Sequence, residues 1–155
     1  MTQVERDEGS IVLADHPDHP GWREWRAGGR NEFNRAVLGL MLVRFDDAQR
    51  ARVRIFPREV LSNPHGTIHG GAIVSFIDVA LFAGSTLLLH ESIESGVTVD
   101  LSHQFLAPGD LSRPLDAVVE VMRETGRMVF ARGQIVQDDD LIGSFSGILR
   151  KIRRQ

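Results

Sequence analysis

The apolar run from Gly70 to Leu89 dominates the hydrophobic pattern, and Asp78 is its only charged residue. A helix that is apolar on every face in a soluble chain is a core helix surrounded by other elements. The run is also long enough to span a bilayer, but a central aspartate costs about 2.5–3.5 kcal/mol there, and no Lys/Arg cluster flanks the run. We therefore predict a buried central helix, no membrane partner, and a buried or half-buried acid at Asp78.

Hydrophobic residues elsewhere in the chain alternate with polar ones, which predicts strands. The predicted strands are Leu40–Phe45 and Ala51–Ile55 before the helix, and Val97–Leu106, Leu115–Met122, Met128–Val136 and Leu141–Leu149 after it. A long antiparallel sheet that curls around the helix buries it on every side. We therefore predict an α+β fold with about five or six strands wrapped around one central helix.

The first part of the chain does not continue this pattern. The spacing of Trp22, Trp25 and Phe33 is roughly helical, which predicts one or two short helices. We expect the tryptophans to pack this segment onto the main domain. The predicted organisation is an N-terminal extension, partly helical, at residues 1–38, followed by a single domain at residues 39–151.

Composition narrows the function. A chain of 155 residues is long enough for one domain with a real core. The net charge of −3 argues against general nucleic-acid binding, which needs a basic face. The chain contains no cysteine, so it has no disulfide, no thiolate nucleophile and no cysteine metal site, and we predict no metal. Its first residues lack a basic segment followed by an apolar one, so we predict a cytoplasmic location.

The start of the predicted helix offers groups that can bind an oxyanion. Gly70 and Gly71 allow a substrate to approach the backbone N–H groups at the positive end of the helix. Asp78 lies about 12 Å further along the helix axis, at about 1.5 Å per residue, so one carbonyl group cannot contact both sites. If both act in one reaction, the second must come from another copy of the chain. This predicts a two-fold dimer with sites at its interface.

The absence of other motifs favours a particular chemistry. The sequence has no G-x-S-x-G nucleophile motif, no H-E-x-x-H zinc motif and no phosphate-binding P-loop. A carboxylate together with an oxyanion site suits hydrolysis of an activated acyl group. A thioester needs little general-acid help, because a thiol with a pKa of about 8.5 leaves readily as thiolate. The sequence therefore favours a thioester over an amide.

The segment Asn63–Gly71, with Asp78 nine residues after His69, resembles the hotdog-fold acyl-CoA thioesterases of the phenylacetate-pathway type, in the 4-hydroxybenzoyl-CoA thioesterase superfamily. Three later segments fit the same pattern: Gly96–Asp100, Phe105–Gly109 and Gly126–Arg127. The resemblance covers residues 39–150. It implies a hotdog fold and dimers that often pair into tetramers.

The resemblance also implies roles for particular residues. Asp78 would be the nucleophile or the general base that activates water. The Gly70 N–H of the partner subunit would polarise the thioester carbonyl, and Asn63 would hold the thioester or the water. His69 would shape the turn, and Thr98 would help to orient water.

The implied ligand is an acyl-CoA, so coenzyme A is part of the substrate and no separate cofactor is expected. Gly71 belongs to the glycine pair that the substrate approaches. Arg127 and Arg150, with Lys151 beside them, are candidates for contacts with the CoA phosphates.

Alternatives stay open for several of these residues. Asn63 also suits an Asx turn before Pro64, His69 a packing role at the helix start, and Thr98 an ordinary strand position. The alternative functions are an acyl-thioester hydratase or dehydratase and a non-catalytic acyl-CoA-binding regulator. A regulator has no need to bear the desolvation cost of Asp78. The sequence does not decide between an aryl and a medium-chain acyl group.

Overall fold

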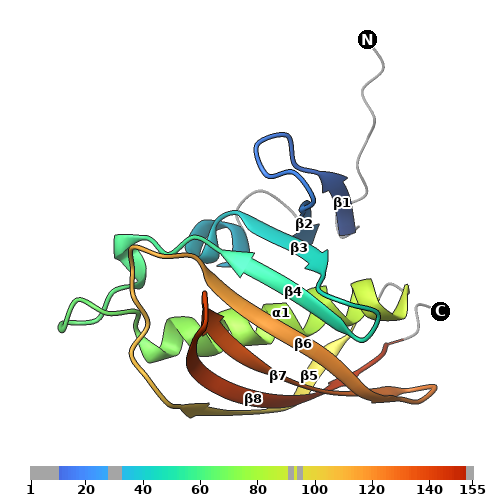
Figure 1. The fold of residues 1–155 in the computed structure, drawn as a ribbon. Helices are drawn as coiled ribbons and strands as arrows, with labels where there is room; N and C mark the ends of the chain where they lie inside the picture. Colours follow the sequence, from blue (N-terminus) through green and yellow to red (C-terminus); the bar gives the residue numbers. More distant parts are fainter. Residues whose placement is uncertain (1–10, 28–32, 91–92, 94–95, 153–155) are drawn as a thin grey trace.

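The computed structural model describes residues 11–27, 33–90, 93 and 96–152. Within these ranges one long helix, α1 (Gly70–Leu89), lies in the hollow of a curved antiparallel sheet (Figure 1). The strands described are β1 (Ile11–Asp15), β2 (Arg23–Ala27), β3 (Met41–Phe45), β4 (Arg50–Ile55), β5 (Val97–Phe105), β6 (Leu115–Glu124), β7 (Met128–Gln137) and β8 (Asp140–Arg150). A π-helical turn, Asn34–Leu38, and a 3-10 turn, Glu59–Leu61, complete the described elements.

The sheet runs in the order β1-β2-β3-β4-β6-β7-β8-β5, with every neighbouring pair antiparallel. Helix α1 connects β4 to β5, which lies at the far edge of the sheet. The predicted α+β architecture, one central helix wrapped by a long antiparallel sheet, is confirmed. The sheet has eight described strands rather than five or six, because β1 and β2 extend it beyond β3.

Helix α1 begins at Gly70, as predicted, and its apolar side chains form the centre of the core. Gly84 allows the close approach to β6, since a Cβ there would lie 2.7 Å from the Val119 Cβ. The helix is the one described element that is long and apolar enough to cross a membrane, with a mean hydropathy of 2.1. The protein itself buries 61% of that stretch, and a core helix meets the same length and composition criteria.

The prediction of short helices between Gly21 and Val37 is wrong for residues Arg23–Ala27. They form strand β2, which pairs with β1 and β3. Only Asn34–Leu38 is helical among the described residues of the extension, and residues 28–32 of the predicted helices lie outside the description. The three-residue spacing of the tryptophans is close to the period of a helix, which is why the sequence suggested one. However, Trp22 precedes the strand and only Trp25 lies in it, so the pairing of β2 with β3 overrides the local pattern.

The loop before β2 is anchored to the outer face of the sheet by Trp22. The guanidinium carbons of Arg44 and Arg54 lie 4.5 and 4.6 Å from the centre of its ring. Such cation–π contacts are favourable, and more so where water is partly excluded. The extension is therefore held on the main domain by contacts on the outer face as well as by strand pairing.

Asp116, on β6, is the buried centre of an ion-pair group on this outer face. Its carboxylate accepts hydrogen bonds from Arg52 at 3.0 Å and from Arg54 at 2.7 and 2.8 Å. Arg52 also donates to Asp46, and this contact lowers the pKa of the Asp46 carboxyl. The side chain of Asp116 is 2% exposed, whereas those of Arg52 and Arg54 still reach solvent.

Asp116→Asn is expected to lower the free energy of unfolding by about 3 kcal/mol, because it leaves two half-buried guanidinium groups without their shared anion. At about 2–4 °C per kcal/mol for a chain of this size, the melting temperature should fall by about 6–12 °C. Thermal and urea unfolding measure both quantities.

Glu120→Gln is the matched control, since Glu120 lies on the same strand and pairs with Arg132 in an exposed contact. It should cost less than about 1 kcal/mol. Equal losses for the two variants would contradict the assignment of Asp116 as the buried centre.

Candidate active site

Asn63 organises the turn that precedes α1. Its side-chain oxygen accepts hydrogen bonds from the backbone N–H groups of His65, at 2.9 Å, and Thr67, at 3.1 Å. Its side-chain nitrogen donates to the Thr67 hydroxyl at 2.8 Å. An isolated β-bridge between Ser62 and Ile68 closes the turn. Within one chain the Asn63 side chain thus forms the Asx-type turn, and Thr67 is a partner that the sequence did not single out.

The first turn of α1 leaves one N–H group without an acceptor. His69 is the N-cap: its Nδ1 accepts from the Gly71 N–H at 2.9 Å, and its backbone oxygen accepts from Ala72 and Ile73. In the described part of the chain, no acceptor contacts the Gly70 N–H. A free N–H at the positive end of a helix suits an anion or an oxyanion. Gly70 therefore offers this group, while the N–H of Gly71 is already bound.

Asp78 lies two turns further along α1 and is half-buried. The Thr98 hydroxyl, on β5, donates a hydrogen bond of 2.5 Å to its Oδ1. The pairing of β5 with β8 shifts register between Thr98 and Asp100, as a β-bulge does. A bulge re-aims side chains locally. The structure therefore brings together Asp78 and Thr98, which the sequence had placed in one site.

A cavity of about 190 Å³ lies beside Asp78. Its other lining residues are Val79 and Phe82 from α1, Ile93 and Gly96 from the connection to β5, and Ile11, Trp25, Ala27 and Asn34 from the N-terminal extension. Two aromatic side chains, Phe82 and Trp25, line the cavity, whereas Phe76 is fully buried in the core. The sequence analysis expected the tryptophans to pack the extension onto the main domain, and it did not single out Ile11, Ala27 or Asn34, which line the cavity through pairing that is distant in sequence.

Arg127 and Arg150 meet in a separate, open groove of about 390 Å³ at the ends of β7 and β8. The Lys151 N–H donates to the Arg127 carbonyl at 2.8 Å, and the Lys151 ammonium pairs with Glu124. The groove thus presents two exposed guanidinium groups. The structure brings these two predicted residues together in a groove that shares no described lining residue with the cavity beside Asp78.

Edge strand β5 carries a histidine near the start of the helix. Burial lowers the pKa of the His103 imidazole, which packs edge-on against Phe105 with ring centres 4.4 Å apart. A Cβ at Gly70 would lie 3.1 Å from the Phe105 ring.

Among the residues described, no three His, Asp or Glu side chains are grouped so that they could hold a metal ion.

A model of the thioesterase superfamily matches residues 65–144, slightly more than half of the 155-residue chain. The chain belongs to the thioesterase superfamily. The matched range of this thioesterase-superfamily protein contains Gly70, Asp78 and Thr98. It leaves out Asn63 and the N-terminal extension.

Solved structures with the same fold include several thioesterase-superfamily proteins. The chain is similar to the PaaI protein of the phenylacetic acid degradation operon of E. coli, with 22% identity and a TM-score of 0.66 over 79% of this chain and 86% of that one. It is similar to thioesterase superfamily member 2 from Mus musculus, with 19% identity and a TM-score of 0.62 over 76% and 86%.

A mutant of the phenylacetic acid degradation protein PaaI from Thermus thermophilus gives 21% identity and a TM-score of 0.63 over 78% of this chain and 100% of that one. At such identities the likeness shows the shared fold, and the predicted hotdog fold is confirmed. The comparison with curated proteins gives no match.

Proposed function

We propose that the protein hydrolyses an acyl-CoA thioester to the free acid and coenzyme A. The observation that carries the proposal is the half-buried Asp78 carboxylate, held by the Thr98 hydroxyl at the wall of a largely apolar cavity. Placing a carboxylate in such a position costs desolvation free energy. A purely structural role for the residue would not explain that cost. Membership of the thioesterase superfamily supports the same chemistry.

Asp78 acts on the thioester carbonyl in one of two ways. As a general base, it accepts a proton from water while the water oxygen attacks the carbonyl carbon. As a nucleophile, its own oxygen attacks, and water later hydrolyses the resulting anhydride. In both cases the carbonyl becomes an oxyanion, the carbon–sulfur bond breaks, and CoA leaves as a thiolate that takes up a proton.

The oxyanion donor in this proposal is the Gly70 N–H of a second subunit. Within one chain, eight residues of helix separate Gly70 from Asp78, which is about 12 Å along the axis. Two copies with antiparallel α1 helices would bring the Gly70 of one to the Asp78 of the other. A donor aimed at such an oxyanion contributes about 10²- to 10³-fold in kcat.

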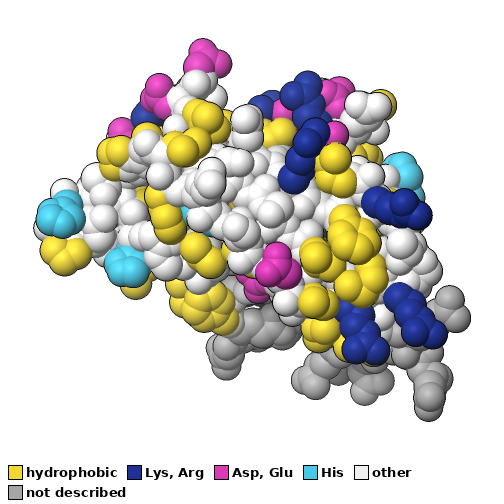
Figure 2. Space-filling view, turned by 90° about the horizontal axis from the view of Figure 1, so that it is seen from below, with side chains coloured by type: hydrophobic (Ala, Val, Ile, Leu, Met, Phe, Trp, Pro, Cys, Tyr) yellow, Lys and Arg dark blue, Asp and Glu magenta, His cyan; other side chains and the backbone are white. Residues whose placement is uncertain are grey.

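The proposed dimer contact is edge strand β5. An unpaired edge with exposed apolar side chains is a template for pairing with another chain. Four such side chains lie on or next to β5: Val97, Val99, Phe105 and Leu106. Figure 2 shows the molecule from below, which is the side on which β5 lies in Figure 1. Hydrophobic side chains form groups on this face, and Lys and Arg side chains lie next to one of these groups.

The groove at Arg127 and Arg150 is the proposed site for the CoA phosphates. Arginine presents a planar fork of donors that binds phosphate oxygens in pairs. Both side chains are exposed in a groove that is open to solvent, as binding of a long, charged group requires.

The experiment that tests the function is thiol release, followed with a chromogenic thiol reagent, over aryl-, medium-chain and long-chain acyl-CoAs. Release that depends on Asp78 would support the thioesterase. Conversion of an enoyl-CoA without release of thiol would indicate a hydratase, because hydration leaves the thioester intact. Binding of CoA esters without turnover would indicate a regulator.

Thr98→Val is expected to lower kcat about 10- to 100-fold, because valine has nearly the same shape but cannot donate the hydrogen bond that Asp78 accepts. Steady-state thiol release measures the effect. Thr98→Ser keeps the hydroxyl and should retain most of the rate. Equal losses for the valine and serine variants would show that the hydrogen bond is not what matters.

A further inference from the structure

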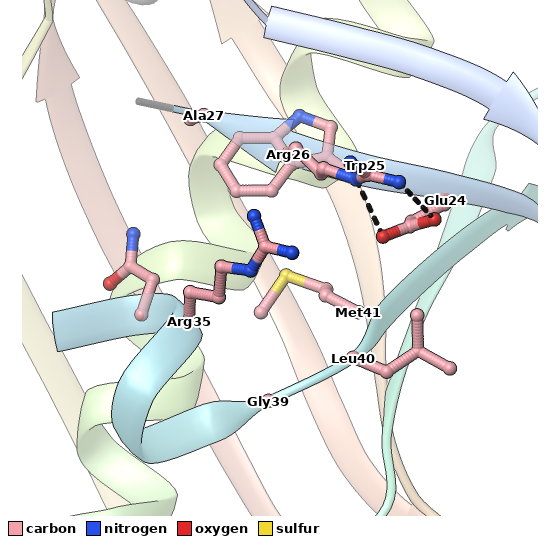
Figure 3. A pocket seen from close by; sticks show the side chains of 9 residues that line it. Glu24, Trp25, Arg26, Ala27, Arg35, Gly39, Leu40 and Met41 are labelled. Carbon is pink, nitrogen blue, oxygen red and sulfur yellow. Dashed lines mark hydrogen bonds and ion pairs between the residues drawn. The ribbon is translucent and has the colours of Figure 1, made fainter. Parts of the chain in front are cut away.

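A second cavity, of about 250 Å³, lies between β2 and the Asn34–Leu38 turn (Figure 3). All of its described lining residues precede residues 65–144, the range that matches the superfamily model. Three residues line both this cavity and the one beside Asp78: Trp25, Ala27 and Asn34. The proposed thioester chemistry assigns no role to the second cavity.

Part of the lining of this cavity is apolar. Trp25, on β2, and Met41, at the start of β3, both line it and are 6% and 4% exposed. The Trp25 indole nitrogen is buried and has no hydrogen-bond partner among the described residues, so the apolar part of the ring meets the cavity. An engineered apolar cavity of about 150 Å³ binds benzene. A cavity of about 250 Å³ therefore accommodates one ring with a short chain attached.

The charged part of the described lining carries more positive than negative groups. Arg26 and Arg35 supply two guanidinium groups, whereas Glu24 supplies one carboxylate. Arg26 binds both oxygens of Glu24, at 2.6 and 2.9 Å, and this contact lowers the pKa of the Glu24 carboxyl. In the described part of the chain, Arg35 has no hydrogen-bond or ion-pair partner. One guanidinium charge of that lining is therefore left without a carboxylate.

Arg35 is placed to bind an anion in this cavity. Figure 3 shows its side chain extending from the turn toward Trp25 and Met41. A guanidinium presents a planar fork of donors that binds a carboxylate through two hydrogen bonds. The neighbouring cavity has the opposite character, because its described lining contains the Asp78 carboxylate and no Lys or Arg. An anion is therefore attracted to the cavity at Arg35 and repelled from the one at Asp78.

We propose that the cavity at Arg35 is a second ligand site, which binds a small carboxylate with an apolar body. The Arg35 guanidinium pairs with the carboxylate, and the apolar body lies against Trp25 and Met41. The ligand class follows from the lining, which combines an unpaired positive charge with an apolar wall of limited size. Binding at this site does not require turnover, so the inference is independent of the proposed thioesterase.

The test uses 3-phenylpropanoate and its neutral amide, 3-phenylpropanamide, which differ in charge but have nearly the same shape. Titration calorimetry gives the Kd of each. The acid should bind with a Kd on the order of 1 mM, about tenfold more tightly than the amide. Arg35→Gln should remove this preference. Arg123→Gln is the matched control and should keep it, because Arg123 is an exposed arginine on β6 that does not line the cavity.

Fluorescence locates the bound acid, because the chain contains only two tryptophans. Trp22→Phe leaves Trp25 as the only indole, and its emission should change with the Kd found by calorimetry. Trp25→Phe leaves Trp22, which stacks with two arginines on the outer face, and its emission should not change.

Several outcomes would overturn the inference. Equal binding of the acid and the amide, or a preference that Arg35→Gln leaves intact, would exclude the pairing with Arg35. Failure of the acid to bind, or binding that leaves the emission of Trp25 unchanged, would exclude the cavity. A preference for the acid that appears only when Asp78→Asn removes the carboxylate would place the ligand in the other cavity.

Discussion

Asp78→Asn is expected to lower kcat for thiol release by about 10²- to 10⁴-fold, the usual contribution of a positioned base. Asparagine has the same shape as aspartate, and its side-chain oxygen can still accept the Thr98 hydrogen bond. It cannot accept a proton from water or attack the carbonyl as a carboxylate does. The fold should therefore persist while the chemical step is lost.

Steady-state kinetics and thermal unfolding, measured on the same preparation, check both parts of this expectation. The exposed Asp139, in the turn between β7 and β8, supplies the control. Asp139→Asn makes the same chemical change at the surface, and kcat should stay within about twofold of the wild-type value. Near-normal turnover by Asp78→Asn would exclude Asp78 as base or nucleophile.

Gly70→Pro is expected to lower kcat by about 10²- to 10³-fold, because it removes the proposed oxyanion donor. Proline is favoured at the first position of a helix, where its fixed φ and missing N–H do no harm. The backbone of His69, with φ −61° and ψ 133°, has the extended conformation that precedes proline. The substitution therefore deletes one N–H without disturbing α1.

Gly70→Ala separates the N–H from the added side chain. Its Cβ meets the Phe105 ring at the same 3.1 Å, and that ring is 57% exposed, so it can move. The N–H remains, and kcat measured by thiol release should stay close to that of the wild-type protein. If alanine and proline reduce kcat equally, crowding by Phe105 and not the N–H explains the loss.

Mixing the two inactive variants tests whether the site is shared between subunits. A hybrid of Asp78→Asn and Gly70→Pro has one site with both defects and one site with none. After random exchange of subunits, half of the dimers are hybrids with one intact site, so about a quarter of wild-type turnover should return. Failure of activity to return would place Asp78 and its oxyanion donor in the same chain.

Local patterns were sufficient to predict most of the main domain. The glycine pair and the apolar run that follows give the start of α1 at Gly70, and the alternation in the last four strands gives their ranges within a few residues. The contact between Asp78 and Thr98 followed from the resemblance to a family, because nothing local pairs a helix position with a strand twenty residues later.

The N-terminal extension could not be predicted in the same way. The three-residue spacing of Trp22 and Trp25 fits a helix and not a strand, and only the pairing with β3 shows that Trp25 lies in a strand while Trp22 precedes it. The unpartnered indole of Trp25 has no signal in the sequence, since it depends on which groups the fold leaves around it. Asn63 suited both a turn and a ligand contact, and its two bonds to Thr67 became visible only in three dimensions.

The two edges of the sheet differ in a way that limits how copies of the chain can assemble. At one edge, β5 has nine residues and exposed apolar side chains, whereas at the other, β1 has five residues and leads directly into a proline-containing turn. Short edge strands are poor templates for further pairing. In the proposed dimer, pairing of β5 with another β5 would use the same surface on both copies, so growth through this edge would stop at two. The short strand β1 of the extension thus makes the second edge of the sheet a poor site for adding further subunits head to tail.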